Sequence, residues 1–134
     1  MGMNVRISRL LLDKLTAMAA EQQTEICGLL LGAGDVCTEI IPAANVVTDP
    51  ARHFEIDPAV LIAAHREARR GGPAIMGHYH SHPSGHAEPS ETDAEAAIAD
   101  GACWLILAQG QALAWRAGPS GLHGRFLPEP LDVI

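Results

Sequence analysis

The sequence has little positive charge. Lysine occurs once, at Lys14, and 9 Lys and Arg residues stand against 16 Asp and Glu residues, which gives a formal net charge of −7. Because an acidic surface repels phosphate groups, nucleic acids and anionic membranes are poor candidate partners. No stretch reaches the roughly 20 apolar residues of a membrane-spanning helix, and the N-terminal residues lack the apolar segment of a secretory signal. These absences predict a cytoplasmic protein with no nucleic-acid and no membrane partner.

Cysteine is also scarce. The chain has 3 cysteines, Cys27, Cys37 and Cys103, which are widely spaced and form no C-x-x-C pair. An odd number of scattered cysteines is typical of reduced thiols in a cytoplasm, where they fill the core. The signature of zinc deaminases, H-x-E together with P-C-x-x-C, is absent because no P-C-x-x-C occurs, which disfavours base deamination.

The chain does contain enough apolar material for one folded domain. Of its 134 residues, 48% are hydrophobic and 19% are charged, which excludes intrinsic disorder. A chain of this length buries roughly two thirds of its unfolded surface, and no repeat, charge block or linker divides it. We therefore expect a single domain over residues 1–134.

Apolar spacing and turn residues predict a mixture of helices and strands. The spacing of Leu11, Leu12 and Leu15 predicts a helix from Ser8 to about Gln22. A second helix is expected to begin at Asp57-Pro58, and a third to cover residues 91–100. We expect strands at 5–7, 26–31, 36–41, 54–56, 74–82, 103–108 and 112–115. Because strands and helices do not alternate strictly, they predict an α/β protein of the α+β kind, with helices packed against a mixed β-sheet.

A histidine-rich segment carries the chemistry. In a strand, residues i and i+2 point to the same face, so His80 and His82 project side by side and can bind one divalent ion. Ser90 begins the next helix, and Asp93 in its first turn can supply a third ligand. Two histidines and one aspartate leave zinc a fourth position for water, which is typical of a catalytic site rather than a structural one.

Other interpretations of these residues remain open at this point. Ser90-x-x-Asp93 also resembles a capping box, although capping and metal binding are compatible because the cap fixes the direction of the first turn. A His-x-His pair such as His80 and His82 also suits a polar sheet edge. Glu25, taken alone, suits an ordinary solvated carboxylate at the start of a strand.

Three residues near this motif have no assigned role. His78 shares the strand face of His80, and we expect it in the core or at its rim rather than beside a metal. His86 falls in the loop after the strand and is expected to be exposed. Cys27 is two residues from Glu25, but a thiol in an apolar strand is more simply a buried side chain than a nucleophile.

Taken together, these motifs resemble a known family. His80-Ser81-His82-Pro83, followed after six residues by Ser90-x-x-Asp93, resembles the signature of JAMM/MPN-type zinc metallopeptidases. The segment from Glu25 to Gly32 resembles the strand that carries the glutamate of this family, and residues 54–58 are similar to bacterial members. The resemblance covers about residues 5–115. It implies the JAMM/MPN fold, a curved mixed β-sheet flanked by helices that is shared with zinc deaminases.

The resemblance also implies a role for each site residue. His80, His82 and Asp93 would hold one zinc ion (Zn2+) per chain, with a bound water completing the coordination. Glu25 would be the general base, which takes a proton from that water and passes it to the leaving amine. Ser90 would donate a hydrogen bond to the tetrahedral oxyanion.

Members of this family cleave amide or isopeptide bonds after the C-terminal Gly-Gly of ubiquitin or ubiquitin-like proteins. The connections at 42–52 and 100–103 are short, so the chain resembles the compact bacterial branch, some of which acts on ubiquitin-like sulfur carriers. We therefore expect a zinc-dependent metallopeptidase or isopeptidase whose partner is a ubiquitin-like sulfur-carrier protein with a Gly-Gly tail. A non-catalytic MPN scaffold and a RadC-like protein are the alternatives, and the sequence leaves a homodimer open.

Overall fold

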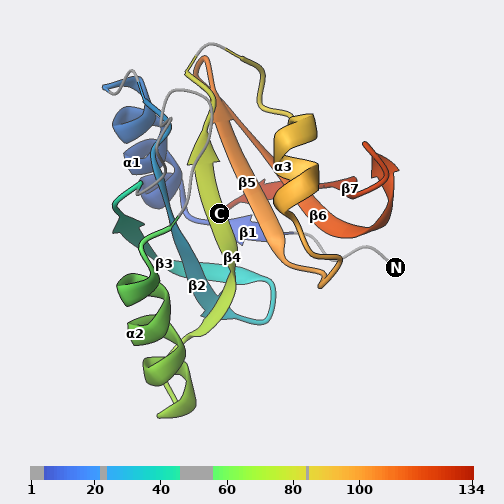
Figure 1. Cartoon of the computed structure of the whole chain (residues 1–134). Helices are drawn as coiled ribbons and strands as arrows, with labels where there is room; N and C mark the ends of the chain where they lie inside the picture. Colours follow the sequence, from blue (N-terminus) through green and yellow to red (C-terminus); the bar gives the residue numbers. More distant parts are fainter. Residues whose placement is uncertain (1–4, 22–23, 46–55, 84) are drawn as a thin grey trace.

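The computed structural model describes residues 5–21, 24–45, 56–83 and 85–134. Within these ranges, eight strands form one mixed sheet in the order β7-β6-β5-β4-β2-β3-β1-β8, and three helices pack against it (Figure 1). The strands are β1 (Val5–Ile7), β2 (Cys27–Ala33), β3 (Val36–Ala43), β4 (Ala74–Ser81), β5 (Cys103–Ala108), β6 (Gln111–Leu122), β7 (Phe126–Glu129) and β8 (Leu131–Val133). The helices are α1 (Arg9–Ala20), α2 (Pro58–Arg69) and α3 (Glu91–Ala96). None of these described helices is both long enough and apolar enough to cross a membrane.

Strand β4 lies near the middle of the sheet. It pairs antiparallel with β2 and parallel with β5. Two pairs of consecutive strands form hairpins, because β2 pairs antiparallel with β3, and β5 with β6. The turn of the second hairpin has positive φ at both Gln109 (48°) and Gly110 (78°), a turn geometry that matches the twist of paired strands. The predicted mixed sheet with packed helices is therefore present.

Helix α1 covers one face of the sheet. It begins where the sequence predicts, because the Ser8 hydroxyl accepts a hydrogen bond from the Leu11 N–H at 3.1 Å and so satisfies a free donor of the first turn. Leu12 and Leu15 are buried in α1. They pack in a cluster with Val5, Ile7, Leu30, Cys37, Tyr79, Cys103, Leu105, Leu107 and Ala114.

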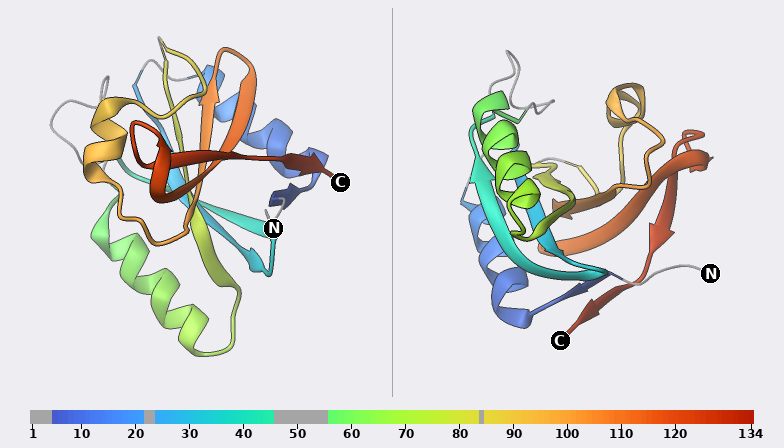
Figure 2. Two further views of the ribbon diagram at one scale, coloured as in Figure 1. Left: turned by 90° about the vertical axis from the view of Figure 1, so that its right-hand side faces the viewer. Right: turned by 90° about the horizontal axis from the view of Figure 1, so that it is seen from below.

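Helices α2 and α3 lie on the opposite face. As predicted, α2 begins at Pro58 directly after its N-cap Asp57. Its Ala64 packs with Leu29, which neighbours Leu30 in β2 and so points to the face opposite α1. Under α3, a second cluster on this face contains Ala87, Trp104, Ile106, Ala108, Trp115, Ala117 and Phe126. Figure 2 shows the two helices over different parts of the same curved sheet.

The curvature has a local cause in β2. The register of β2 shifts between Leu30 and Leu31 against β4, and between Leu31 and Gly32 against β3. Such irregularities bend a strand and increase its twist. A Cβ on Gly28 would collide with the Tyr79 ring, so glycine at this position lets Tyr79 pack fully buried across β2.

Three expectations differ from the structure or lie outside it. Helix α3 ends at Ala96 rather than near residue 100, because Ala97 adopts an extended conformation and packs against the cluster under α3. The strand expected at 112–115 continues to Leu122 as β6, and β7 and β8 are strands that the sequence did not predict. Residues 54 and 55 of the expected strand at 54–56 lie outside the described residues, and Ile56 forms a single bridge to Asn45.

Candidate metal centre

Two histidines meet at the carboxyl end of β4. His80 is in β4, which ends at Ser81, and His82 follows directly. The Nε2 atoms of the two rings lie 3.2 Å apart, as the alternation of side chains in a strand predicts. His80 has no exposed surface and the His82 side chain is 13% exposed. Because β4 lies between β2 and β5, the pair does not lie at a polar sheet edge.

Asp93 completes a triangle with these histidines. Its Oδ2 atom lies 3.2 Å from Nε2 of His80 and 3.2 Å from Nε2 of His82. The capping box is also present: the Ser90 N–H donates to Oδ2 of Asp93 at 2.9 Å, and the Asp93 N–H donates to Oγ of Ser90 at 3.0 Å. Both interpretations of Ser90-x-x-Asp93 therefore describe the same geometry, in which the cap directs the carboxylate toward the two histidines.

The histidine rings offer lone pairs toward this point. Nδ1 of His82 lies 2.8 Å from the carbonyl oxygen of His86. Because a carbonyl only accepts, Nδ1 carries the proton and, in the neutral ring, Nε2 keeps its lone pair. Burial lowers the pKa of His80, so this ring is neutral near pH 7.

The site favours a positive charge at its centre. Burial would raise the pKa of Asp93, but its contacts with the His80 and His82 rings and the hydrogen bond from the Ser90 N–H outweigh burial and lower that pKa. Burial would likewise lower the pKa of His82, but its contacts with Asp93 and the His86 carbonyl raise that pKa. An ionised carboxylate and two imidazole nitrogens that attract a cation form a suitable donor set for a divalent metal.

The spacing of the three atoms fits zinc. A tetrahedral zinc ion with ligands at about 2.0 Å separates neighbouring ligand atoms by about 3.3 Å. The three distances of 3.2 Å among His80, His82 and Asp93 match one face of that tetrahedron.

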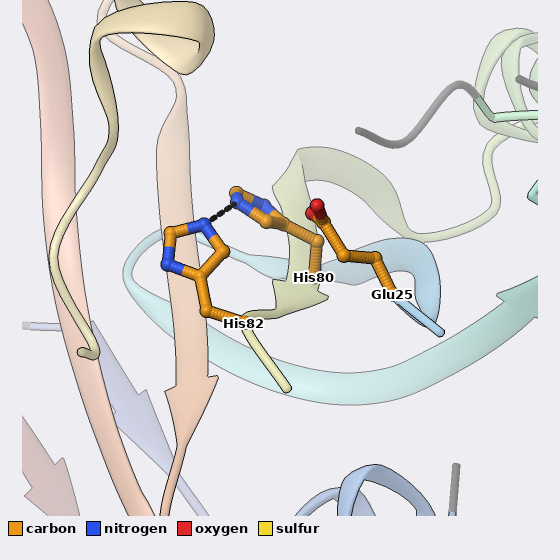
Figure 3. Close-up of side chains that lie close together, drawn as sticks. All are labelled: Glu25, His80 and His82. Atoms are coloured by element: carbon orange, nitrogen blue, oxygen red, sulfur yellow. Dashed lines mark hydrogen bonds between the residues drawn. The ribbon is translucent and has the colours of Figure 1, made fainter. Parts of the chain in front are cut away.

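Glu25 lies beside this triangle. One ligand atom from each of Glu25, His80 and His82 lies within 4.8 Å of the others, and Figure 3 shows the Glu25 carboxylate next to the His80 ring. Glu25 is only 4% exposed, so it is not the solvated carboxylate that its position alone suggests. The Asn45 side chain donates to its carbonyl oxygen at 2.9 Å, which holds the backbone of Glu25 just before the start of β2.

Sequence reasoning missed the contribution of Ser81. Its hydroxyl accepts a hydrogen bond from the Ile26 N–H at 2.9 Å, and its N–H donates to the Ile26 carbonyl at 3.1 Å. These bonds join the histidine strand to the residue that follows Glu25. The signal in the sequence was a small polar residue between two candidate ligands, on the opposite face of the strand.

The three unassigned residues have simple environments. His78 is partly buried and packs edge-on against Trp104, with ring centroids 4.2 Å apart, and burial lowers its pKa to about 3. The Cys27 thiol is buried, and burial raises its pKa to about 11, so it is a poor nucleophile. His86 is exposed, although its carbonyl holds His82.

The chain is similar to known proteins along most of its length. Residues 8–118 match the family of prokaryotic homologs of the JAB domain. A probable TtuB-protein conjugate cleaving protease of Thermus thermophilus is 32% identical over 98% of this chain and 82% of its own length. A desampylase of Haloferax volcanii is 34% identical over 66% of this chain. The chain spans 65% of that relative's length.

Solved structures share the fold. A protein from Desulfitobacterium hafniense superposes with a TM-score of 0.82 at 24% identity, covering 97% of this chain and 92% of that chain. A JAB1/MPN domain protein from Archaeoglobus fulgidus superposes with a TM-score of 0.59 at 21% identity, covering 97% and 99%. With the family match over most of its length, the chain belongs to the prokaryotic JAB family and is a hydrolase of the JAMM type.

Proposed function

We propose that this hydrolase is a zinc-dependent metallopeptidase or isopeptidase. It cleaves the amide bond that follows the C-terminal Gly-Gly of a ubiquitin-like sulfur-carrier protein. The observation that carries the proposal is the triangle of Nε2, Nε2 and Oδ2 atoms of His80, His82 and Asp93 with 3.2 Å sides, beside a buried Glu25. His80, His82 and Asp93 would hold one zinc ion per chain.

Zinc held there would act as a Lewis acid and lower the pKa of a bound water toward about 7. Glu25 supplies the general base. Its buried carboxylate, within 4.8 Å of the histidine nitrogens, accepts one proton of the attacking water. The remaining hydroxide adds to the substrate carbonyl carbon. Glu25 then returns the proton to the amine nitrogen as the C–N bond breaks, so the products are a carboxylate and an amine.

Ser90 stabilises the oxyanion of the tetrahedral intermediate. Its Oγ atom accepts a hydrogen bond from the Asp93 N–H, which uses a lone pair and leaves the single hydroxyl proton available as a donor. Removing such a donor typically costs about 100- to 1,000-fold in turnover. The capping bond also fixes the position of the hydroxyl at the start of α3.

The burial of the centre supports a slender substrate. His80 is fully buried and Asp93 is 6% exposed, so a scissile carbonyl must enter a narrow space. Two glycines have no side chains to collide with the walls of that space. The similarity to the Thermus and Haloferax relatives, a probable conjugate cleaving protease and a desampylase, supports a protein conjugate as the substrate class.

We also propose that residues 1–134 form one catalytic domain. The C-terminal strand β8 pairs with the N-terminal strand β1 in the same sheet that carries His80.

The test offers a ubiquitin-like carrier extended by one residue beyond Gly-Gly, and a version with Ala-Val in place of Gly-Gly, with release of that residue followed by mass spectrometry. We expect cleavage of the Gly-Gly carrier and at least 100-fold slower cleavage of the Ala-Val version, because a carbonyl misplaced by about 1 Å costs about that factor. Elemental analysis should find one zinc per chain in the wild type. His82→Ala should lose most of it.

Glu25→Gln separates catalysis from metal binding. The amide keeps the shape of the side chain but is not a base, so we expect full zinc content and a loss of turnover of about 100- to 10,000-fold.

Equal cleavage of both carriers would contradict the Gly-Gly specificity. Full zinc content in both His80→Ala and His82→Ala would place the metal elsewhere. A protein that holds no zinc and binds the carrier without cutting it would be a scaffold instead.

A further inference from the structure

The loop between His82 and Ser90 is held by side chains from the far half of the sheet. Three of its carbonyl oxygens, on alternate residues, each accept a side-chain hydrogen bond. The donors are Gln109 to Gly85 at 3.2 Å, Trp115 to Ala87 at 3.0 Å, and His123 to Pro89 at 3.1 Å. The last of these contacts, from His123, is made to Pro89, the residue directly before Ser90.

The contact of His123 falls on one particular peptide group. Nε2 of His123 must carry the proton, because the Pro89 carbonyl only accepts. The same peptide group ends in the Ser90 N–H, which donates to Oδ2 of Asp93 at 2.9 Å. Because a peptide group is planar and rigid, His123 at its oxygen and Asp93 at its nitrogen fix each other's orientation.

We propose that His123 is a positioning residue of the metal centre, which acts through the Pro89–Ser90 peptide on Asp93 and Ser90. The inference rests on the proposed function for its catalytic consequence. The hydrogen bond from His123 holds the peptide so that the Ser90 N–H keeps Oδ2 of Asp93 directed at the two histidines. It also polarises that N–H, because hydrogen bonds in series strengthen one another.

The backbone conformation at this position favours glycine over histidine. His123 has φ of 53° in the turn between β6 and β7, and Gly121 near the end of β6 and Gly124 in the turn also have positive φ (96° and 67°). A non-glycine residue is uncommon in this region and strained there, and a glycine would adopt it freely. His123 is exposed, so burial does not require it either. Its hydrogen bond to Pro89 is the interaction that the side chain supplies.

His123 lies outside the part of the chain that the family match covers, residues 8–118. Carboxylate ligands depend on the groups that hydrogen-bond to them, and losing such a group typically costs 10- to 100-fold in metal affinity or activity. His123 is one peptide further from Asp93 than such a group. We therefore expect the lower end of that range, about tenfold.

The test compares His123→Gly, His123→Gln and the control His65→Ala, which changes an exposed histidine on α2. Glycine suits the positive φ and removes the donor, whereas glutamine restores an N–H of similar reach. The first measurement is hydrogen exchange of the Ser90 amide by NMR in the metal-free protein. The second is zinc affinity by competition with a chromophoric chelator, and the third is the split between kcat and KM on the Gly-Gly carrier.

For His123→Gly we expect faster exchange of the Ser90 amide, zinc affinity weakened by about tenfold, and a lower kcat with KM unchanged. His123→Gln should recover most of each loss, and His65→Ala should match the wild type. Wild-type exchange or wild-type zinc affinity in His123→Gly overturns the inference. So does an equal loss in the glycine and glutamine variants, because the N–H donor would then not matter.

The exchange measurement separates this inference from the proposed function. It needs neither zinc nor substrate, so it decides the role of His123 even if the wild-type protein fails to cleave the carrier. Cleavage by the wild type together with unchanged Ser90 exchange in His123→Gly would support the proposed function and overturn the role of His123.

Discussion

Single residues at this centre serve two interactions at once. Oδ2 of Asp93 accepts the Ser90 N–H that caps α3, and the same atom faces Nε2 of both histidines. Ser81 lies between the two histidines in sequence and forms hydrogen bonds with both backbone groups of Ile26, its N–H and its carbonyl oxygen. The groups that position the site are therefore the groups that form the local secondary structure, and replacing them affects both.

Cys27 gives a prediction at this scale. Burial raises its pKa to about 11, so at pH 8 only about one thiol in a thousand is a thiolate, against about one in four for an ordinary cysteine of pKa near 8.5. We expect alkylation of native Cys27 by iodoacetamide to be at least 100-fold slower than in the urea-unfolded protein. The measurement is peptide mass spectrometry over time.

The raised pKa also fixes the sign of the pH dependence. Reactivity should stay low through pH 8–10 and rise only as the pH approaches 11. Cys27→Ala should keep the cleavage activity of the wild type. Rapid alkylation of the native protein at pH 8, with loss of cleavage, would contradict the buried-thiol interpretation and return Cys27 to the candidate nucleophiles.

At the scale of helices and strands, the sequence predicts the features that depend on local periodicity and capping residues, namely strand faces and helix starts. The i, i+2 spacing of His80 and His82 predicts their shared face, and Ser90 with Asp93 predicts the start of α3. The end of α3 depends on how Ala97 packs against distant strands, so it was placed too late. Pro128 lies inside β7 and Pro130 between β7 and β8, and proline argues against a strand.

The contacts that hold the metal-centre loop could not be predicted from spacing. Trp115 reaches Ala87, and His123 reaches Pro89, across 28 and 34 residues of sequence. No local pattern relates such partners, and a tryptophan in an apolar strand is more simply assigned to the core. Trp115 is indeed buried, but its indole N–H has this second role.

Trp115→Phe tests the anchoring of that loop. Phenylalanine keeps an aromatic ring in the cluster with Phe126 but removes the donor to the Ala87 carbonyl, which lies in a buried contact. Leaving a buried acceptor without its partner costs about 1–3 kcal/mol, so we expect the free energy of unfolding to fall by that amount. Urea unfolding of the metal-free protein measures it.

Leu113→Ala is the matched control on the same strand, because Leu113 is 42% exposed and its loss should cost much less. A stability of Trp115→Phe equal to that of the wild type would mean that the loop does not depend on this hydrogen bond.

Over the whole molecule, the C-terminal segment occupies both edges of the sheet. β7 pairs with β6 at one edge, and β8, after the single residue Pro130, pairs with β1 at the other. An open sheet edge exposes unpaired backbone groups. Here one short segment covers both edges and links β6 to the N-terminal strand β1.

Deleting residues 131–134 removes this link and is the prediction at the largest scale. The deletion eliminates the β1–β8 pairing and the hydrogen bonds of Ile134 with Ile7 (2.8 Å) and Arg9 (3.1 Å). Against β3, β1 then keeps only the pairing at Arg6 and Ile7. With about 1 kcal/mol for each net hydrogen bond lost, we expect the free energy of unfolding to fall by about 2–3 kcal/mol. Urea unfolding measures the loss, and faster amide exchange at Ile7 should accompany it.

Ile134→Ser keeps the backbone of an exposed residue and should change stability by less than about 0.5 kcal/mol. Full stability after the deletion would show that β8 only lies beside β1. The loss expected here, with the zinc affinity retained in the protein that stays folded, would show that β8 stabilises the sheet without shaping the site at the end of β4.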